Sequence, residues 1–177
     1  MKGKLFVVAT PIGNLQDITL RAIEVLKSVS TIVSEDTRVS IKLLNQYGIK
    51  KRLLSNFKEN EAKRAAEIIK ILENGEDVAL ISDAGTPLIS DPGQILVQKV
   101  RERGIQIIPI PGPSSVVTAI SVSGFNASPA VFYGFFPKKE GEKKSIVGEL
   151  KNFPYTALFI ESPHRIKKTL KFFYENF

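Results

Sequence analysis

Short β-branched apolar runs alternate with longer amphipathic runs along the first two thirds of the chain. Unbroken apolar runs such as Leu5–Ala9 predict buried strands, and apolar residues at helical spacing, such as Leu20, Ile23 and Leu26, predict helices. Strands that alternate with helices are typical of parallel βαβ units with helices on both faces of the sheet. The pattern therefore predicts an α/β fold built on a parallel sheet.

The predicted elements change in character after residues 111–113. Before that point the predicted strands are Lys4–Ala9, Thr31–Ser34, Arg52–Phe57, Val78–Ser82 and Ile105–Pro109, and the predicted helices are Asp17–Val29, Ser40–Tyr47, Glu61–Glu73 and Pro92–Arg103. After it, we predict a helix at Ser114–Val122, a strand at Val131–Phe135, a charged loop at Lys138–Lys144, a helix at Ser145–Lys151, a strand at Thr156–Ile160 and a helix at His164–Tyr174. We therefore predict two domains, an N-terminal α/β domain of residues 1–113 and a partial C-terminal α/β domain of residues 114–177.

Composition excludes several classes of protein. The 177 residues are 43% hydrophobic and 24% charged, as in ordinary globular proteins. No apolar run approaches the roughly 18 residues of a membrane-spanning helix, and Pro11 and Gly13 close the first run too early for a signal peptide. The chain has no cysteine and one histidine, His164, which excludes disulfides, thiolate zinc sites and multi-histidine metal centres. We expect a cytoplasmic protein with no metal and no membrane partner.

The net charge of +7 is concentrated toward the C-terminal third, with +3 up to Pro113 and +4 in the shorter stretch from Ser114. A basic surface favours an acidic partner, of which nucleic acid is the commonest. The alternative is a lysine-rich surface that only meets solvent.

Candidate chemistry follows the predicted strands, because ligands of parallel α/β sheets bind beyond the C-terminal ends of the strands. Four such segments are rich in Gly, Pro, Asp and Thr: residues 10–15, 35–38, 83–93 and 110–115. Gly and Pro also occur in ordinary loops. The segment from Asp83 to Pro92 is nevertheless longer than the 2–6 residues, roughly, that a connection needs.

Motifs that are absent from the chain exclude some kinds of site. The chain contains no Gly-X-Gly, no phosphate-binding P-loop and no Gly-X-Ser-X-Gly, so neither a pyrophosphate site nor a hydrolase nucleophile is expected. Small residues such as Ala84, Gly85 and Gly112 let the backbone approach a ligand closely. Glu35 and Asp36 could bind a metal, but beside Arg38 they more often form a salt-bridged loop. His164, at a predicted helix start, is more often a capping or surface residue than a base.

Six segments carry a family resemblance: TPIGNLQDITLRA (Thr10–Ala22), VSEDTR (Val33–Arg38), SDAGTPLISDPG (Ser82–Gly93), PIPGPSS (Pro109–Ser115), FYGFFP (Phe132–Pro137) and FIESPHR (Phe159–Arg165). With them, the sequence resembles the tetrapyrrole methylase superfamily of S-adenosylmethionine-dependent methyltransferases, and in particular its ribosomal RNA branch. That branch methylates a cytidine ribose 2′-oxygen of 16S rRNA. The resemblance implies two α/β domains with the cofactor in the cleft between them, a homodimer, and 16S rRNA or the small ribosomal subunit as partner.

The resemblance also implies roles for individual residues. Those expected to contact S-adenosylmethionine are Pro11, Ile12, Gly13, Asp83, Ala84, Gly85, Thr86, Ile89, Ser114, Ser115, Glu161 and Ser162. Members of the superfamily continue beyond the helix that ends here at Phe177, so the second domain is expected to be incomplete. Two alternatives stay open: methylation of a corrin or porphyrin precursor, and a non-catalytic relative.

Methyl transfer from a sulfonium is an in-line displacement, for which positioning matters most. A ribose hydroxyl is weakly acidic, so a nearby base should help. The candidate bases are Glu35, Asp36, Asp83, Asp91 and Glu161. We favour Asp36 or Glu35 as the catalytic residue, with Arg38 as an anchor for phosphate or ribose. RNA is expected to dock on Lys138, Lys139, Lys143, Lys144, Lys167, Lys168 and Lys171.

Overall fold

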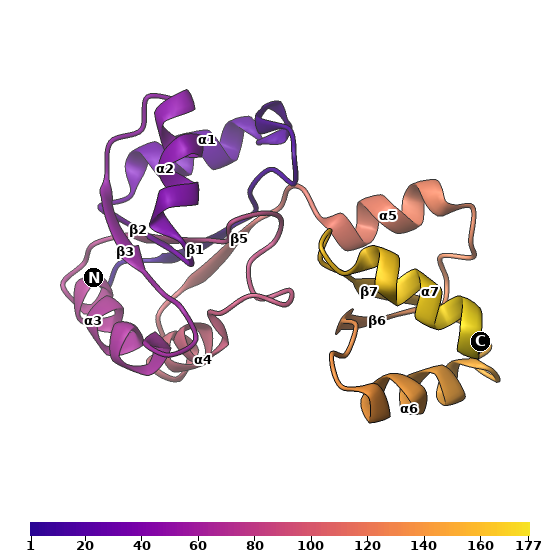
Figure 1. Cartoon of the computed structure of the whole chain (residues 1–177). Coiled ribbons are helices and arrows are strands. Elements are labelled where there is room, and N and C mark those ends of the chain that lie inside the picture. Colours follow the sequence, from indigo (N-terminus) through magenta and orange to yellow (C-terminus); the bar gives the residue numbers. More distant parts are fainter. The chain divides into compact units, whose positions relative to one another are not determined.

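A five-stranded parallel sheet organises the first part of the chain (Figure 1). Its strands are β1 (Leu5–Val8), β2 (Thr31–Ser34), β3 (Arg52–Ser55), β4 (Val78–Ile81) and β5 (Ile107–Ile110), in the spatial order β3-β2-β4-β1-β5. Every neighbouring pair is parallel. The predicted α/β fold with a parallel sheet is confirmed.

Side-chain alternation along β4 shows why the sheet has helices on both faces. All four residues of β4 are buried. Val78 and Leu80 pack into one apolar cluster with α3 (Glu61–Glu73) and α4 (Gln94–Glu102). Ala79 and Ile81 pack into another with α1 (Leu20–Ser28) and α2 (Thr37–Gln46). Successive side chains of a strand point to opposite faces, so a strand buried on both faces is apolar throughout.

Two helix starts differ from the prediction because side chains cap the backbone at other positions. The helix predicted from Asp17 begins later, as α1 at Leu20, because Thr19 Oγ1 accepts from Ala22 N at 3.1 Å. Asp17 instead ends a short 3-10 turn, Leu15–Asp17. Helix α2 begins at Thr37 rather than Ser40, because the Asp36 carboxylate accepts from Arg38 N at 2.9 Å. Such caps satisfy amides that the first turn leaves unbonded.

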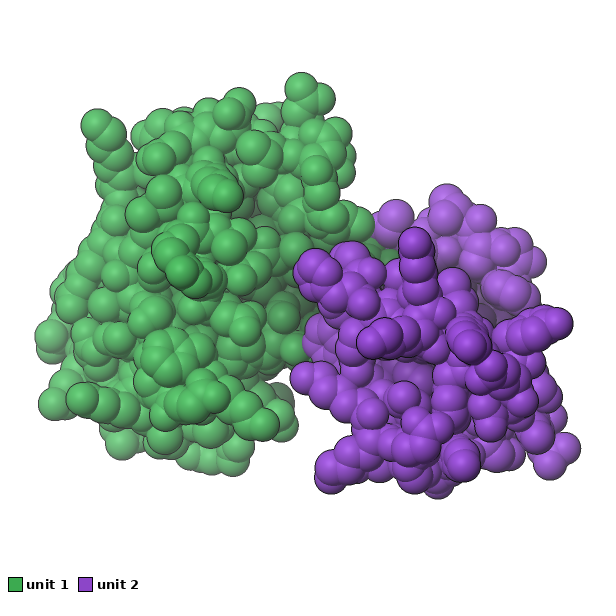
Figure 2. Space-filling model, viewed as in Figure 1, with its two compact units in different colours: residues 1–115 green, residues 116–177 purple.

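The structure describes all 177 residues in a computed structural model, and they form two compact units, residues 1–115 and 116–177 (Figure 2). The domain boundary after residue 113 remains a prediction, since a compact unit is not yet an independently folding domain. The longest helix, α3, has 13 residues, and no helix has the apolar length that a membrane crossing requires.

The second unit contains two parallel strands, β6 (Ala130–Phe135) and β7 (Thr156–Ile160), connected through α6 (Glu140–Leu150). Helices α5 (Ser115–Ser123) and α7 (Ile166–Asn176) precede and follow them. Its buried apolar cluster is small and consists of Phe136, Val147 and Phe172, whereas no residue of α5 is buried.

The prediction of a charged loop at Lys138–Lys144 is wrong, because α6 begins at Glu140. Glu140 and Glu142 lie in its first turn, where negative charge complements the helix dipole. Two ion pairs at i,i+3 spacing, Lys139–Glu142 and Lys143–Glu140, both at 3.3 Å, add to this. A solvent-facing helix therefore accommodates the same charges that suggested a loop.

Candidate functional site

The loops that follow the strands are bonded to one another along one edge of the sheet, which we call the C-terminal edge. Because the strands are parallel, all their C-terminal ends lie there. Asp36 N, after β2, donates to Asp83 Oδ1, after β4, at 3.1 Å. Thr86 Oγ1 donates to the carbonyl of Pro113, after β5, at 3.2 Å. Segments far apart in the sequence thus form one continuous surface.

A buried network fixes the end of β1 against the segment 83–93. Thr10 and Gly85 exchange both backbone hydrogen bonds at 2.9 Å. Thr10 Oγ1 donates to Ser82 O at 2.9 Å, and Ser82 Oγ donates to Gly85 O at 2.9 Å. Gly85 has φ +85°, a conformation that costs most other residues free energy.

Two glycines bring the backbones at this edge into close approach. A Cβ at Gly112 would lie 3.1 Å from the Cβ of Ala9, and one at Gly85 would lie 3.4 Å from Cγ2 of Ile12. The first distance is tighter than most contacts of a real Cβ, so a side chain at residue 112 would force Ala9 or the chain after β5 to shift by a few tenths of an ångström.

The segment 83–93 contains strained backbone conformations, and a carboxylate from another part of the chain binds its end. Leu88 and Ser90 have φ +71° and +70°, which non-glycine residues seldom adopt. The Glu61 carboxylate, 7% exposed, accepts from Gly93 N at 2.9 Å and Ile95 N at 2.8 Å where α4 begins. Sequence reasoning missed Glu61, since an acidic residue in the first turn of a helix is ordinary.

Four carboxylates gather at this edge and differ in environment. Burial, then Asp83, Asp91 and Asp36, raise the pKa of Glu35. Burial also raises the pKa of Asp83, and burial with the Asp83 charge raises the pKa of Asp91 to about 6. By contrast, hydrogen bonds from Arg38 lower the pKa of Asp36 to about 2. Arg38 Nη2 lies 2.6 Å from Asp36 Oδ2.

A pocket of about 410 Å³, which we call the acidic pocket, opens at the ends of β2, β3 and β4. It is lined by Glu35, Asp36, Thr37, Arg38, Ser55, Phe57 and Asp83. The Glu35 carboxylate has no hydrogen-bond partner, whereas both Asp36 oxygens are bonded to Arg38. Asp83 also lines a smaller adjoining cavity of about 190 Å³ beside Pro11 and Leu43. Ser55 and Phe57 were not predicted as site residues; the only signal was an aromatic residue directly after a strand.

The predicted cofactor residues of the first unit lie on the C-terminal edge, with Pro11 and Gly85 buried, Ile12, Asp83, Thr86 and Ser114 partly buried, and Gly13, Ala84, Ile89 and Ser115 exposed. Glu161 and Ser162 lie in the second unit, after β7. The structure describes each unit separately, so the roles of these residues in one site remain predictions.

Glu161 has an internal structural role. It accepts from Arg165 Nε at 2.8 Å, Thr169 Oγ1 at 2.6 Å and Ser162 N at 2.6 Å. Burial acts to raise the pKa of Glu161, but these hydrogen bonds together lower it. Glu161 therefore fastens the end of β7 to α7 and stays ionised, which does not suit a general base.

The basic residues of the second unit are mostly exposed. Lys167 and Lys168 project from α7, and Lys171 lies 3.6 Å from Glu175. Lys143 instead packs its ammonium group over the Phe172 ring, 5.1 Å from the ring centre. Across the chain, no group of three or more histidine or acidic side chains is arranged to hold a metal ion.

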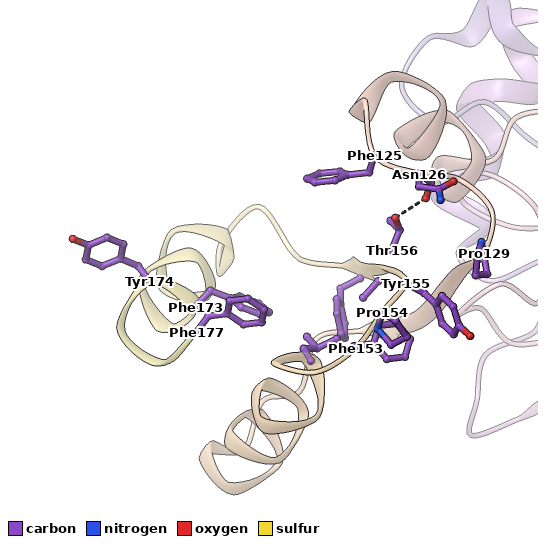
Figure 3. Close-up of a pocket in the computed structure, with 13 residues that line it drawn as sticks. Phe125, Asn126, Pro129, Phe153, Pro154, Tyr155, Thr156, Phe173, Tyr174 and Phe177 are labelled. Atoms are coloured by element: carbon purple, nitrogen blue, oxygen red, sulfur yellow. Dashed lines mark hydrogen bonds between the residues drawn. The ribbon is translucent and has the colours of Figure 1, made fainter.

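A cavity of about 740 Å³ forms an apolar groove in the second unit (Figure 3). Aromatic side chains from Phe153, Tyr155, Phe159, Phe173 and Phe177 line it. A hydrogen bond from Thr156 Oγ1 to Asn126 O joins two of the lining residues (Figure 3). The groove contains none of the predicted site residues, so the candidate chemistry lies at the C-terminal edge of the first unit.

Comparison with known proteins gives consistent relatives. The chain is 46% identical over 170 residues to "Ribosomal RNA small subunit methyltransferase I" of Mesorhizobium japonicum, covering 96% of this chain and 58% of that protein. It is 46% identical over 169 residues to the protein of the same name from Thermotoga maritima, covering 96% and 76%. The chain thus spans less than two thirds of the length of the first relative and about three quarters of the second.

Solved structures share the fold. Uroporphyrin-III-C-methyltransferase from Thermus thermophilus superposes with a TM-score of 0.62 at 22% identity, over 87% of this chain and 74% of that one. A diphthine synthase superposes with a TM-score of 0.74 at 12% identity, over 92% and 65%. At such identities the likeness concerns the fold alone.

The family model described as "Tetrapyrrole (Corrin/Porphyrin) Methylases" matches residues 4–176, which is almost the whole chain. The parallel sheet with its elaborate C-terminal edge and the 46% identical relatives agree with that match. This chain belongs to the tetrapyrrole methylase family.

Proposed function

We propose that this chain is an S-adenosylmethionine-dependent methyltransferase that transfers a methyl group to a cytidine ribose 2′-oxygen of 16S rRNA. The observation that carries the proposal is the 46% identity, over 96% of the chain, to proteins named as ribosomal RNA small subunit methyltransferases. The excess of Lys and Arg supports a polyanionic substrate such as RNA.

The C-terminal edge fits the methyl donor. Gly85 and Gly112 let the segments at the ends of the strands pack closely against Ile12 and Ala9, so backbone amides and carbonyls of several segments converge there. When bound, S-adenosylmethionine supplies an electrophilic methyl group on a sulfonium that is already a good leaving group. The segments around Pro11–Gly13 and Asp83–Ile89 would hold and orient it, together with Ser114, Ser115, Glu161 and Ser162.

Of the two favoured bases, Glu35 suits proton transfer better than Asp36. Asp36 caps α2 and is paired with Arg38, so its carboxylate is a weak base. Glu35 is unpaired, and its raised pKa brings it closer to neutrality, where general bases are most effective. Glu35 would accept the ribose proton, while the Arg38 side chain, 88% exposed, would anchor a phosphate.

The lysines of α7 and of the segment 138–144 would bind the RNA backbone. Phosphate contacts position a nucleic acid without selecting its sequence, and they weaken as salt rises. We also propose that the chain forms a homodimer, which sedimentation equilibrium on the full chain would test.

The first experiment is calorimetric titration of the full chain with S-adenosylmethionine, followed by transfer of labelled methyl to 16S rRNA and to small subunits. We expect micromolar binding, about −8 kcal/mol, and a product ribose that resists alkaline cleavage. Transfer to a uroporphyrin-type tetrapyrrole instead would favour the other family activity. Binding without transfer to any substrate would favour a non-catalytic relative.

Matched variants test the base. Glu35→Gln should lower kcat by about 10²- to 10⁴-fold, the usual contribution of general-base catalysis, without changing the Kd for S-adenosylmethionine. Asp36→Ala should chiefly weaken the α2 cap, at about 1 kcal/mol of stability. A kcat that is unchanged in Glu35→Gln would refute the role of Glu35.

A further inference from the structure

The acidic pocket is larger than proton transfer alone requires, and one of its walls is aromatic. Its volume of about 410 Å³ falls within the range of pockets that hold small organic molecules, roughly 300–1,000 Å³. Phe57, directly after β3, lines it and is 41% exposed. The ring is therefore available to a ligand.

Hydrogen bonds hold the backbone on both sides of Phe57. Its amide donates to Asn60 Oδ1 at 2.9 Å, and Asn60 Nδ2 donates to Ser55 O at 3.3 Å. Arg64 Nε donates to the same carbonyl at 2.8 Å. An aromatic ring on a fixed backbone can bind a flat ligand face without first being ordered, which favours stacking of a nucleobase.

Two sequence neighbours of the pocket residues carry buried polar groups without hydrogen bonds. Ser34 Oγ and both polar atoms of the Asn56 side chain are buried and have no hydrogen bond. Ser34 precedes Glu35, and Asn56 stands between the two pocket residues Ser55 and Phe57. Neither side chain lines the acidic pocket, so a ligand there would be recognised by Phe57 and the carboxylates that do line it.

The side chains that line the acidic pocket favour one kind of nucleobase. Three carboxylates, from Glu35, Asp36 and Asp83, line the pocket, and carboxylates accept hydrogen bonds but do not donate them when ionised. Acidic side chains pair with the exocyclic amine of cytosine, whereas uracil presents a carbonyl oxygen at that position. A carbonyl facing these carboxylates would meet only like partial charge.

We propose that the acidic pocket receives the target nucleotide turned out of the RNA, with an amino-bearing pyrimidine stacked on Phe57 and its amine facing the carboxylates. The inference rests on the proposed function, because it takes this nucleotide as the one to be methylated. Enzymes that act on a single nucleotide commonly take it out of its stack into such a pocket. The ribose of that nucleotide then lies in the same pocket as Glu35.

The test uses the full chain and two free nucleotides as probes, cytidine 5′-monophosphate and uridine 5′-monophosphate, titrated to millimolar concentration while backbone amide shifts are recorded by NMR. Cytidine monophosphate should shift the amides of residues 35–38, 55–57 and 83. Phe57→Leu should weaken its binding by about 5- to 150-fold, the usual contribution of one stacked base. Phe57→Tyr should retain it, and Phe135→Leu, at an exposed phenylalanine outside the pocket, should have no effect.

Three results would overturn the proposal: no shift with either nucleotide, equal affinity for both, or unchanged affinity in Phe57→Leu. Titration with S-adenosylmethionine and assay of methyl transfer in the same variants separate this inference from the proposed function. Transfer to RNA with an unchanged KM in Phe57→Leu refutes the pocket and leaves the function standing. Phe57-dependent binding of cytidine monophosphate without any methyl transfer refutes the function and leaves the nucleotide pocket standing.

Discussion

Removing the Glu61 carboxylate should loosen the segment 83–93 more than any exposed charge could. Glu61 is 7% exposed and accepts from two amides, Gly93 N and Ile95 N, at 2.9 and 2.8 Å. A hydrogen bond to an ionised partner contributes about 1.5–3 kcal/mol, and a buried donor left without its acceptor is costly. Burial of the carboxylate itself offsets part of this gain.

For Glu61→Ala we therefore expect a loss of about 2–4 kcal/mol in the free energy of unfolding of the first unit. Glu61→Gln should lose less, because the amide oxygen still accepts a hydrogen bond. Glu73→Ala, on the same helix, removes an exposed carboxylate paired with Arg103 at 2.9 Å and should cost less than about 1 kcal/mol.

Amide hydrogen exchange is the suitable assay, because a chain with two units need not unfold in one transition. In Glu61→Ala, the core amides of β4 should exchange about 30- to 900-fold faster, which corresponds to 2–4 kcal/mol. The Gly93 and Ile95 amides should lose their protection first. If these two amides stay protected, or if Glu73→Ala has the same effect, then Glu61 does not hold the segment.

Three further predictions concern charge and backbone. Burial raises the pKa of Asp91 from 3.8 to about 6, so ionisation of Asp91 opposes folding as pH rises from about 4 through 6. Asp91→Asn should therefore stabilise the chain against urea at pH 7.5 but not at pH 4. An equal effect at both pH values would contradict this. Gly85→Ala and Gly48→Ala, at φ +85° and +63°, should each lower the free energy of unfolding by about 1–2 kcal/mol. Only Gly85→Ala should weaken S-adenosylmethionine binding, measured by calorimetry. Weaker binding in both variants would refute the placement of the methyl donor. Changing Lys167 and Lys168 to Gln should make the slope of log K for single-stranded RNA against log salt shallower by about 1.4, and an unchanged slope would exclude them from the phosphate contacts.

Local sequence patterns determined most of the first unit. The apolar runs and helical spacings place five strands and four helices close to their observed positions, because burial on both faces requires continuous apolar strands. The same patterns placed the Gly- and Asp-rich segments after the strands, and parallel strands necessarily bring such segments to one edge. Resemblance in six short motifs then supplied the family, which the family match confirms.

Tertiary structure decided what each polar residue does. Glu35 and Asp36 are neighbours of the same charge, yet Asp36 is occupied by Arg38 and a helix start while Glu35 faces a pocket without a partner. Glu61 holds a segment about thirty residues away, and no local pattern marks it. The sequence by itself determines where apolar surface must be buried, since that depends on neighbours along the chain. Hydrogen-bond partners and pKa values depend on which distant groups meet, and that is known only once the strands are ordered β3-β2-β4-β1-β5.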